Sequence, residues 1–334
     1  MTTLHDVARD AGVSTATVSR VLRGVAITAP ATREKVLSAV KKLGYSPNPI
    51  GQALRAGHVN SVALLMGDIE QGWYSSLARD MQLALEAEGL DLLLFNLGHS
   101  ETRLRVVLER AVSMRLRGVA LATSDRFPAD KLTSVRARLA ESNIPLVAVG
   151  SSLDQFGIPS IAHDDSEASC AAVHHLVERG HHPIAFLSRI EKSATGRVRF
   201  EGYRRGLQEC GLGFDPELVW DVSASYRFKA GHDALLDAVG RKLGMRAVIA
   251  GSDEIALGAM AGALDLGLRV PEDIAFIGFG GLEWGGYVRP ALTTLDADTS
   301  EFGRQFSALL KASHGAGETP RKLIARRLIA RQTS

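Results

Sequence analysis

Cysteine is scarce in this chain of 334 residues, which contains only Cys170 and Cys210. Both lie in apolar, helix-like segments, and no run of cysteine and histidine has the spacing of a metal site. The sequence therefore predicts neither a disulfide framework nor a bound metal. The pairs His174-His175 and His181-His182 have no metal-ligating companions nearby in the sequence, so we interpret them as hydrogen-bonded or solvent-facing side chains.

Long apolar runs are missing as well. No segment could span a bilayer, and residues 1–6 lack the basic region and apolar stretch of a signal peptide. We therefore expect a cytoplasmic protein without a membrane partner. No nucleophile elbow, P-loop or HExxH run is present, and Glu283 stands where the dinucleotide fingerprint beginning at Gly278 needs its third glycine. We expect no cofactor and no enzymatic activity.

The net charge is only +2, but it is unevenly distributed. Residues 1–58 contain eight Lys and Arg against three Asp and Glu, whereas the remaining residues contain 31 against 34. A basic head on a slightly acidic body indicates a polyanion as the partner of the head alone.

The first 45 residues predict three short helices. Gly12 ends the first apolar-periodic stretch, and Ser14 stands at the N-cap position of the second. The third is expected over Thr28–Leu43, with Pro30 in its first turn and Gly44 at its end. We place the head at residues 1–46 and a hinge with linker at 47–58.

The helix, glycine turn and second helix have the spacing of a helix-turn-helix, whose second helix enters the major groove of DNA. Thr15 and Ala16 would face base edges there, and Arg20 could reach a guanine or a phosphate. Hydroxyl groups and the helix N-terminus would hold phosphates. The expected DNA contacts are Ser14, Thr15, Ala16, Thr17, Ser19 and Arg20.

From residue 59 onward, short apolar runs alternate with amphipathic helices. This pattern predicts parallel sheets covered on both faces, and two such series predict two doubly wound lobes with a cleft between them. The apolar runs are 61–66, 90–95, 118–122 and 145–149 in the first series and 183–187, 246–250 and 273–277 in the second. The expected fold is thus α/β, with a first lobe of residues 59–162 plus about 292–320 and a second of 163–291 plus about 321–334.

The run DVARDAGVSTATVSRVL at residues 6–22 resembles the LacI/GalR family of bacterial transcriptional regulators, as do Thr32–Val36, Leu43–Tyr45 and Pro47-Asn48. The resemblance implies a periplasmic-binding-protein-like body that binds a small-molecule effector between its lobes. It also implies a homodimer on pseudo-palindromic double-stranded operator DNA, although a tetramer stays open. The alternative for the head is a structural three-helix unit.

In that family the linker folds into a hinge helix whose leucine wedges into the minor groove. Leu54 falls on that position, and Arg55 beside it could contact phosphate. The chain departs from the usual Ala-Arg pair with Gly51-Gln52, which weakens the helix and removes a cation. Leu54 could instead pack on the body.

The resemblance also implies an effector pocket. Its expected residues are Asp68, Trp73, Tyr74, Gly150, Thr195, Arg199, Tyr226, Ser252, Asp253 and Gly280. Gly150 and Gly280 replace two aspartates of the family, and Ser252 replaces an asparagine. The loss of two carboxylates would leave Arg199 less neutralised, which favours an anionic effector such as a sugar acid over a neutral sugar.

Two other functions fit the body alone. A solute-binding protein would have this form, but the head and the lack of a signal peptide argue against it. An enzyme of doubly wound fold would need catalytic groups, and none is evident. Whether the effector releases or recruits the protein on DNA is not fixed by the sequence.

Overall fold

The computed structural model describes residues 2–22, 28–46, 58–222, 226–312 and 320–334. The chain divides into two compact units, Met1–Val59 and Asn60–Ser334. No described helix has both the length and the apolar character needed to cross a membrane. The expected hinge contacts Leu54 and Arg55, together with Gly51-Gln52, lie outside the described residues.

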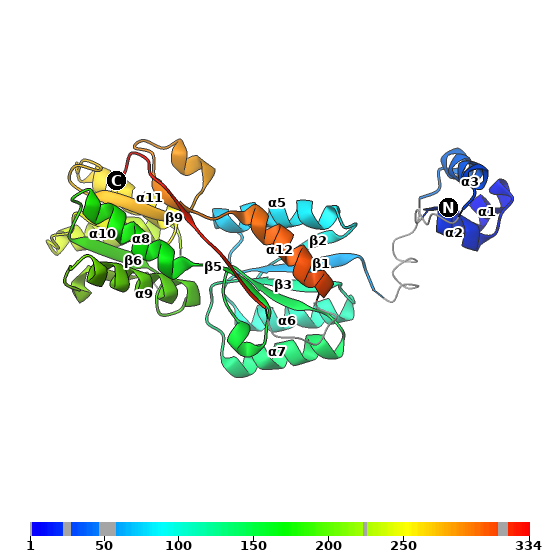
Figure 1. Cartoon of the computed structure of the whole chain (residues 1–334), viewed down its shortest axis with the longest axis horizontal. Helices are drawn as coiled ribbons and strands as arrows, with labels where there is room; N and C mark the ends of the chain where they lie inside the picture. Colours follow the sequence, from blue (N-terminus) through cyan, green and yellow to red (C-terminus); the bar gives the residue numbers. More distant parts are fainter. Residues whose placement is uncertain (1, 23–27, 47–57, 223–225, 313–319) are drawn as a thin grey trace. The chain divides into compact units, whose positions relative to one another are not determined.

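The first unit contains the three expected helices, α1 (Leu4–Ala11), α2 (Thr15–Leu22) and α3 (Pro30–Leu43) (Figure 1). Thr3 and Asp6 form a capping box at the start of α1, and Gly12 ends it in the left-handed conformation. The third helix begins at Pro30 rather than at Thr28, because proline fits the first helical position. Small apolar side chains make the core of this unit: Val7, Ala8, Ala11, Val18, Val21, Val36 and Ala39.

The second unit contains two six-stranded sheets, which confirms the α/β class. The first sheet has the order β11-β5-β4-β3-β1-β2 and is parallel throughout. Its strands are β1 (Ser61–Met66), β2 (Asp91–Asn96), β3 (Gly118–Ala122), β4 (Leu146–Val149), β5 (Ser160–His163) and β11 (Arg321–Ile324). Helices α5 (Gly72–Glu86) and α12 (Thr299–Ala312) pack together on one side of it, and α6 (Glu101–Ser113) and α7 (Ala129–Glu141) on the other (Figure 1). We call this sheet with its helices the first lobe.

The second sheet has the order β12-β10-β9-β8-β6-β7, with β12 antiparallel to β10 and the other pairs parallel. Its strands are β6 (Ile184–Ser188), β7 (Val219–Asp221), β8 (Ala247–Ala250), β9 (Ala275–Gly280), β10 (Thr293–Asp296) and β12 (Arg327–Ile329). Helix α8 (Asp165–Glu178) packs on α9 (Ala194–Glu209), and α10 (Phe228–Gly240) packs on α11 (Asp253–Asp265). This sheet with its helices is the second lobe. The described residues also form three short 3-10 helices, Asp154–Phe156, Pro216–Leu218 and Glu283–Gly286.

The chain passes between the lobes three times, and the last two passages differ from the sequence prediction. Residues 293–296 form β10 in the second sheet, although we expected 292–320 in the first lobe. Residues 321–324 form β11 beside β5 in the first sheet, although we expected 321–334 in the second. The first sheet therefore takes one late strand, β11, and the second takes two, β10 and β12, because each sheet has a free edge beside its last consecutive strand.

Candidate functional site

A pocket lies between the two lobes at the carboxyl ends of their strands, where doubly wound sheets bind ligands. The first lobe contributes loops that follow β1, β3 and β4, and the second contributes the start of α9 and the ends of β8 and β9. Most of the expected pocket residues line it: Trp73, Tyr74, Gly150, Thr195, Arg199, Tyr226, Ser252 and Gly280.

Asp68 and Asp253 are not among the lining residues. Asp68 accepts a hydrogen bond from the backbone N–H of Glu70 and so shapes the loop after β1. Asp253 is fully buried, and its carboxyl group accepts hydrogen bonds from the Thr294 hydroxyl at 2.5 Å and the Leu282 N–H at 2.8 Å. Burial raises the pKa of Asp253 to about 6 despite these bonds. Asp253 therefore holds the end of β9 in place rather than facing a ligand.

Arg199 belongs to a buried charge cluster around Asp165, a carboxylate that the sequence analysis did not pair with it. Its Nε lies 3.3 Å from Oδ1 of Asp165, and its Nη1 donates to the carbonyl of Gly251 at 2.5 Å. Arg326 shares the same carboxylate, with its Nε 2.6 Å from Oδ1. Both guanidinium groups stack on Phe279, at 4.4 and 5.4 Å from the ring centroid. Two cations thus share one anion, and the cluster keeps one positive charge in excess.

Glycine at position 150 does not leave an open space. A Cβ atom there would lie 2.5 Å from Cη2 of Trp73, and the backbone φ of Gly150 is +83°. The indole ring of Trp73 therefore occupies the place where the side chain of an aspartate would begin. Tyr74 and Phe302 contact that ring edge-on, at centroid distances of 5.1 and 6.1 Å. Position 150 thus carries no carboxylate, and the indole ring of Trp73 lines the pocket in its place.

Apart from Nε of Arg199, which lies 3.3 Å from Asp165, three buried polar atoms on pocket residues have no hydrogen-bond partner among the described residues: Nε1 of Trp73, Nε2 of Gln71 and Nε2 of His163. The first two are N–H donors. His163 is neutral because burial, helped by Arg326, holds its pKa well below the usual range. Its Nδ1 lies 3.4 Å from the carbonyl of Ile324, so the proton belongs on Nδ1 and Nε2 is an acceptor. Unpaired buried polar groups are costly, and a polar ligand would satisfy these three.

Polar contacts join the lobes beside the pocket. Asp125, after β3, accepts from Nη1 of Arg189, after β6, at 2.6 Å, and within the first lobe it also contacts Nδ1 of His99 at 2.9 Å. Oε1 of Glu254 accepts from the Gly72 N–H at 2.8 Å. Because the Asp125–Arg189 and Gly72–Glu254 bonds cross from one lobe to the other, they depend on how the lobes are closed.

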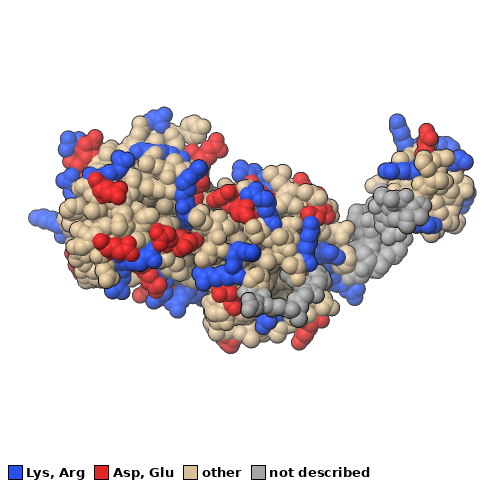
Figure 2. Space-filling model, in the orientation of Figure 1, with Lys and Arg blue, Asp and Glu red and all other residues tan. Residues whose placement is uncertain are grey.

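On the head, the expected DNA contacts lie on one surface of α2. Ser14 and Thr17 share a hydrogen bond of 2.9 Å between their hydroxyls, and Ser14 also accepts from the Thr17 N–H, as an N-cap does. Arg20 is exposed and folds back toward the Ala16 carbonyl at 3.4 Å. Thr15, Thr17 and Ser19 are partly exposed, while Val18 and Val21 face the core. Lysine and arginine side chains are prominent on the visible face of this unit (Figure 2).

Comparison with known proteins identifies both parts. Residues 3–48 match the family described as bacterial regulatory proteins, lacI family, and residues 173–334 match the periplasmic binding protein-like domain. Catabolite control protein A of Priestia megaterium is 31% identical over 92% of this chain and 91% of its own length. The chain belongs to the LacI family. Like its relatives, it is a DNA-binding transcriptional regulator and not a free-standing solute-binding protein.

Other LacI-family members agree. The HTH-type transcriptional repressor CytR of Escherichia coli K12 is 29% identical over 92% of this chain and 88% of its own. The lac repressor dimer bound to operator and the anti-inducer ONPF has a TM-score of 0.87 at 25% identity, over 99% of this chain and 98% of that one. The regulator CelR in complex with cellobiose has a TM-score of 0.72 at 28% identity, over the full length of both.

Sequence reasoning missed several pocket residues. Arg326 lies in the third passage between the lobes, more than 120 residues from Arg199, so no local pattern connects the two. Gln71 and Glu254 stand at helix starts and look like ordinary polar residues. His163 and Asp165 stand at the end of β5 and the start of α8, but only the structure shows that Asp165 joins two arginines.

Proposed function

We propose that this LacI-family regulator binds an acidic, hydroxyl-rich effector, of the sugar-acid class, in the pocket between its lobes, and that the effector controls operator affinity. The observation that carries the proposal is the donor set: two arginines that share one carboxylate, beside the unpaired N–H groups of Trp73 and Gln71. A ligand carboxylate would balance the excess positive charge. Its hydroxyls would pair with Gln71, Trp73 and the acceptor nitrogen of His163.

Effector binding in this pocket would change operator affinity through the closure of the two lobes. A ligand that contacts both lobes favours the closed arrangement, in which the Asp125–Arg189 and Gly72–Glu254 contacts form. Differential affinity for two lobe arrangements is sufficient to change operator affinity. The solved lac repressor is a dimer on its operator, and we propose that this chain also binds a pseudo-palindromic operator as a homodimer. We further propose that it works in the cytoplasm and catalyses no reaction.

A thermal-shift experiment on the full chain tests the effector class. We expect an aldonic or uronic acid to raise the melting temperature and to quench or shift Trp73 fluorescence, whereas the neutral sugar of the same carbon skeleton does neither. The acid should then change affinity for an operator selected from random duplexes. If neutral sugars bind and their acids do not compete, the acidic class is wrong while the regulator assignment stands.

We propose that Ser14, Thr15, Ala16, Thr17, Ser19 and Arg20 contact the operator, with Thr15, Ala16 and Arg20 at base edges. The support is that all six residues are exposed or half-buried at the start of α2 or along it, whereas Val18 and Val21 face the core. Leu54 and Arg55 remain proposed hinge contacts on the strength of the family resemblance alone.

Replacement of Arg20 by Ala should weaken specific operator binding by roughly 10- to 100-fold, since one base-edge contact contributes about 1–3 kcal/mol. It should also relax the preference at one base pair of each half-site. Lys42→Ala is the matched control, because it removes the same charge from α3, where Lys42 pairs with Asp10 at 2.6 Å. Fluorescence anisotropy on the selected operator and on single-base variants measures both. Equal losses in the two variants would reduce Arg20 to a general electrostatic role.

A further inference from the structure

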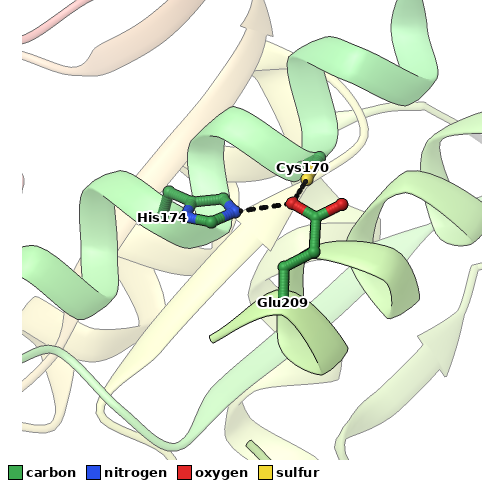
Figure 3. A group of neighbouring side chains, drawn as sticks. All are labelled: Cys170, His174 and Glu209. Carbon is green, nitrogen blue, oxygen red and sulfur yellow. Dashed lines mark hydrogen bonds and ion pairs between the residues drawn. The ribbon is translucent and has the colours of Figure 1, made fainter. Parts of the chain in front are cut away.

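We propose that Cys170, His174 and Glu209 form a zinc-binding site on the second lobe, separate from the effector pocket. Cys170 and His174 stand one turn apart on α8, and Glu209 is the last residue of α9. Figure 3 shows the three side chains pointing toward one another across the gap between these helices. No spacing in the sequence indicates this group, because the glutamate lies 35 residues beyond the histidine.

The distances between the three ligand atoms suit a single ion. Oε2 of Glu209 lies 3.3 Å from Sγ of Cys170 and 2.9 Å from Nε2 of His174, and all three atoms lie within 4.8 Å of one another. Zinc binds sulfur, nitrogen and oxygen at about 2.0–2.3 Å in a tetrahedron, which separates neighbouring ligand atoms by about 3.5 Å. Small rotations of the exposed side chains of His174 and Glu209 would bring their ligand atoms to those distances around an ion that also contacts Sγ of Cys170.

The close packing of α9 against α8 fixes the position of the proposed site. A Cβ on Gly202 would overlap the Ser166 carbonyl oxygen, and one on Gly206 would lie 2.8 Å from Cβ of Val173. Because glycine stands at both positions, α9 can approach α8 closely enough for Glu209 to reach across. Cys170 is only 2% exposed, so its sulfur is held by packing. The side chains of His174 and Glu209 are 40% and 48% exposed, which leaves an ion a route from solvent and room for a water as fourth ligand.

Outer contacts orient two of the ligands as metal sites usually require. Nδ1 of His174 lies 3.6 Å from Sγ of Cys210, so a protonated Nδ1 can donate there and leave Nε2 for the metal. Nε of Arg205 lies 3.4 Å from Oε1 of Glu209, and Arg205 also contacts Glu167 at 2.7 Å. Arg205 thus holds one carboxylate oxygen while the other faces Cys170 and His174.

The mixture of sulfur, nitrogen and oxygen ligands selects zinc over magnesium or calcium, which prefer oxygen alone. Cys170 would bind as the thiolate and release its proton to the buffer. The ion would tie α8, which begins at Asp165, to α9, which carries Arg199 in its second turn.

Titration of the metal-free full chain with Co²⁺, in a phosphine reductant and without chelating buffer, tests the site. We expect one equivalent per chain to produce cobalt–thiolate charge-transfer absorption together with intense tetrahedral ligand-field bands, and Zn²⁺ to displace the cobalt and abolish both. Cobalt spectra without thiolate absorption, or with octahedral intensity only, would overturn the proposal.

Variants locate the ligands. His174→Gln and Glu209→Gln change exposed side chains, so they should fold normally and weaken Zn²⁺ binding at least tenfold in competition with a chelating dye. Cys170→Ser should lose the charge-transfer band. His232→Gln is the matched control, because His232 also contacts carboxylates, of Asp233 and Asp265, but no thiol, and it should bind zinc as the wild type does. Unchanged affinity in His174→Gln and Glu209→Gln would refute the site even if Cys170→Ser fails to fold.

Discussion

Replacement of Asp165 by Asn is expected to destabilise the second unit by about 3–5 kcal/mol, the usual cost of leaving buried charges unpaired. The side chain of Asp165 is 4% exposed, and those of Arg199 and Arg326 are 10% and 3% exposed. Without the carboxylate, two guanidinium groups would face each other in a poorly solvated site. Chemical denaturation at neutral pH, followed by circular dichroism, measures the loss.

The pH dependence gives this prediction a second readout. Burial would raise the pKa of Asp165, but Arg199 and Arg326 outweigh it and lower the pKa to about 2. Since the pKa of aspartate in the unfolded chain is about 3.9, this stabilisation is complete above that value and is lost as the pH falls toward 2. The difference in unfolding free energy between wild type and Asp165→Asn should therefore shrink between about pH 4 and pH 2.

Glu167→Gln is the matched control for Asp165→Asn. Glu167 lies on the same helix and pairs with Arg205 at 2.7 Å, but both side chains are exposed. Such a pair contributes about 0–1 kcal/mol. If Asp165→Asn and Glu167→Gln were equally stable, the buried cluster would not contribute the free energy of unfolding that we expect of it. A third variant, Asp165→Asn with Arg326→Met, should recover part of the stability, because only one unpaired cation would remain.

The sequence predicted most of the strands, but not the shortest strands or the lobes to which all of the late strands belong. Alternation of apolar runs and helices was enough to predict both lobes, because each buried strand leaves its own signal. The four-residue β5 and three-residue β7 were not predicted, since such short strands show no clear pattern. The late strands β10 and β11 were placed in the wrong lobes because either sheet could accept a further strand beside its last consecutive one, whereas β12 lies in the lobe expected for 321–334. Only long-range packing decides such choices.

Some residues of the candidate pocket could likewise be predicted from the sequence, and others could not. Trp73, Arg199 and Ser252 follow strands or begin helices, so position along the chain and family resemblance located them. Arg326 becomes part of the pocket only because the third passage between the lobes runs beside the first. Its Nη1 lies 3.4 Å from the carbonyl of Leu295 at the second passage. The side chain of Arg326, which itself lies on the third passage, therefore contacts both Leu295 at the second passage and Asp165 at the first.

Gly150→Asp, which restores the carboxylate typical of the family, is expected to damage this protein rather than to convert it into a neutral-sugar sensor. The left-handed backbone at Gly150 costs an L-residue about 1–2 kcal/mol, and the Cβ contact with Trp73 adds roughly 1–3 kcal/mol of overpacking. Because Tyr74 and Phe302 back the indole, Trp73 has little room to move away. The new carboxylate would also compete with an acidic effector for Arg199 and Arg326. We expect a lower denaturation midpoint and loss of the effector-induced thermal shift.

Controls separate these contributions to the Gly150→Asp effect. Gly180 has a φ of +78°, and a Cβ atom there would meet no other atom within 4 Å, so Gly180→Asp measures the backbone strain alone. Gly150→Ala adds the contact without the charge. Trp73→Leu in the Gly150→Asp background should return about 0.5–3 kcal/mol of coupling energy, as residues in direct contact do. If Gly150→Asp cost no more than Gly180→Asp and the coupling were zero, Trp73 would not occupy the place of the missing side chain. The pocket would then be open at Gly150, and a bulkier ligand than a simple sugar acid would fit between the lobes.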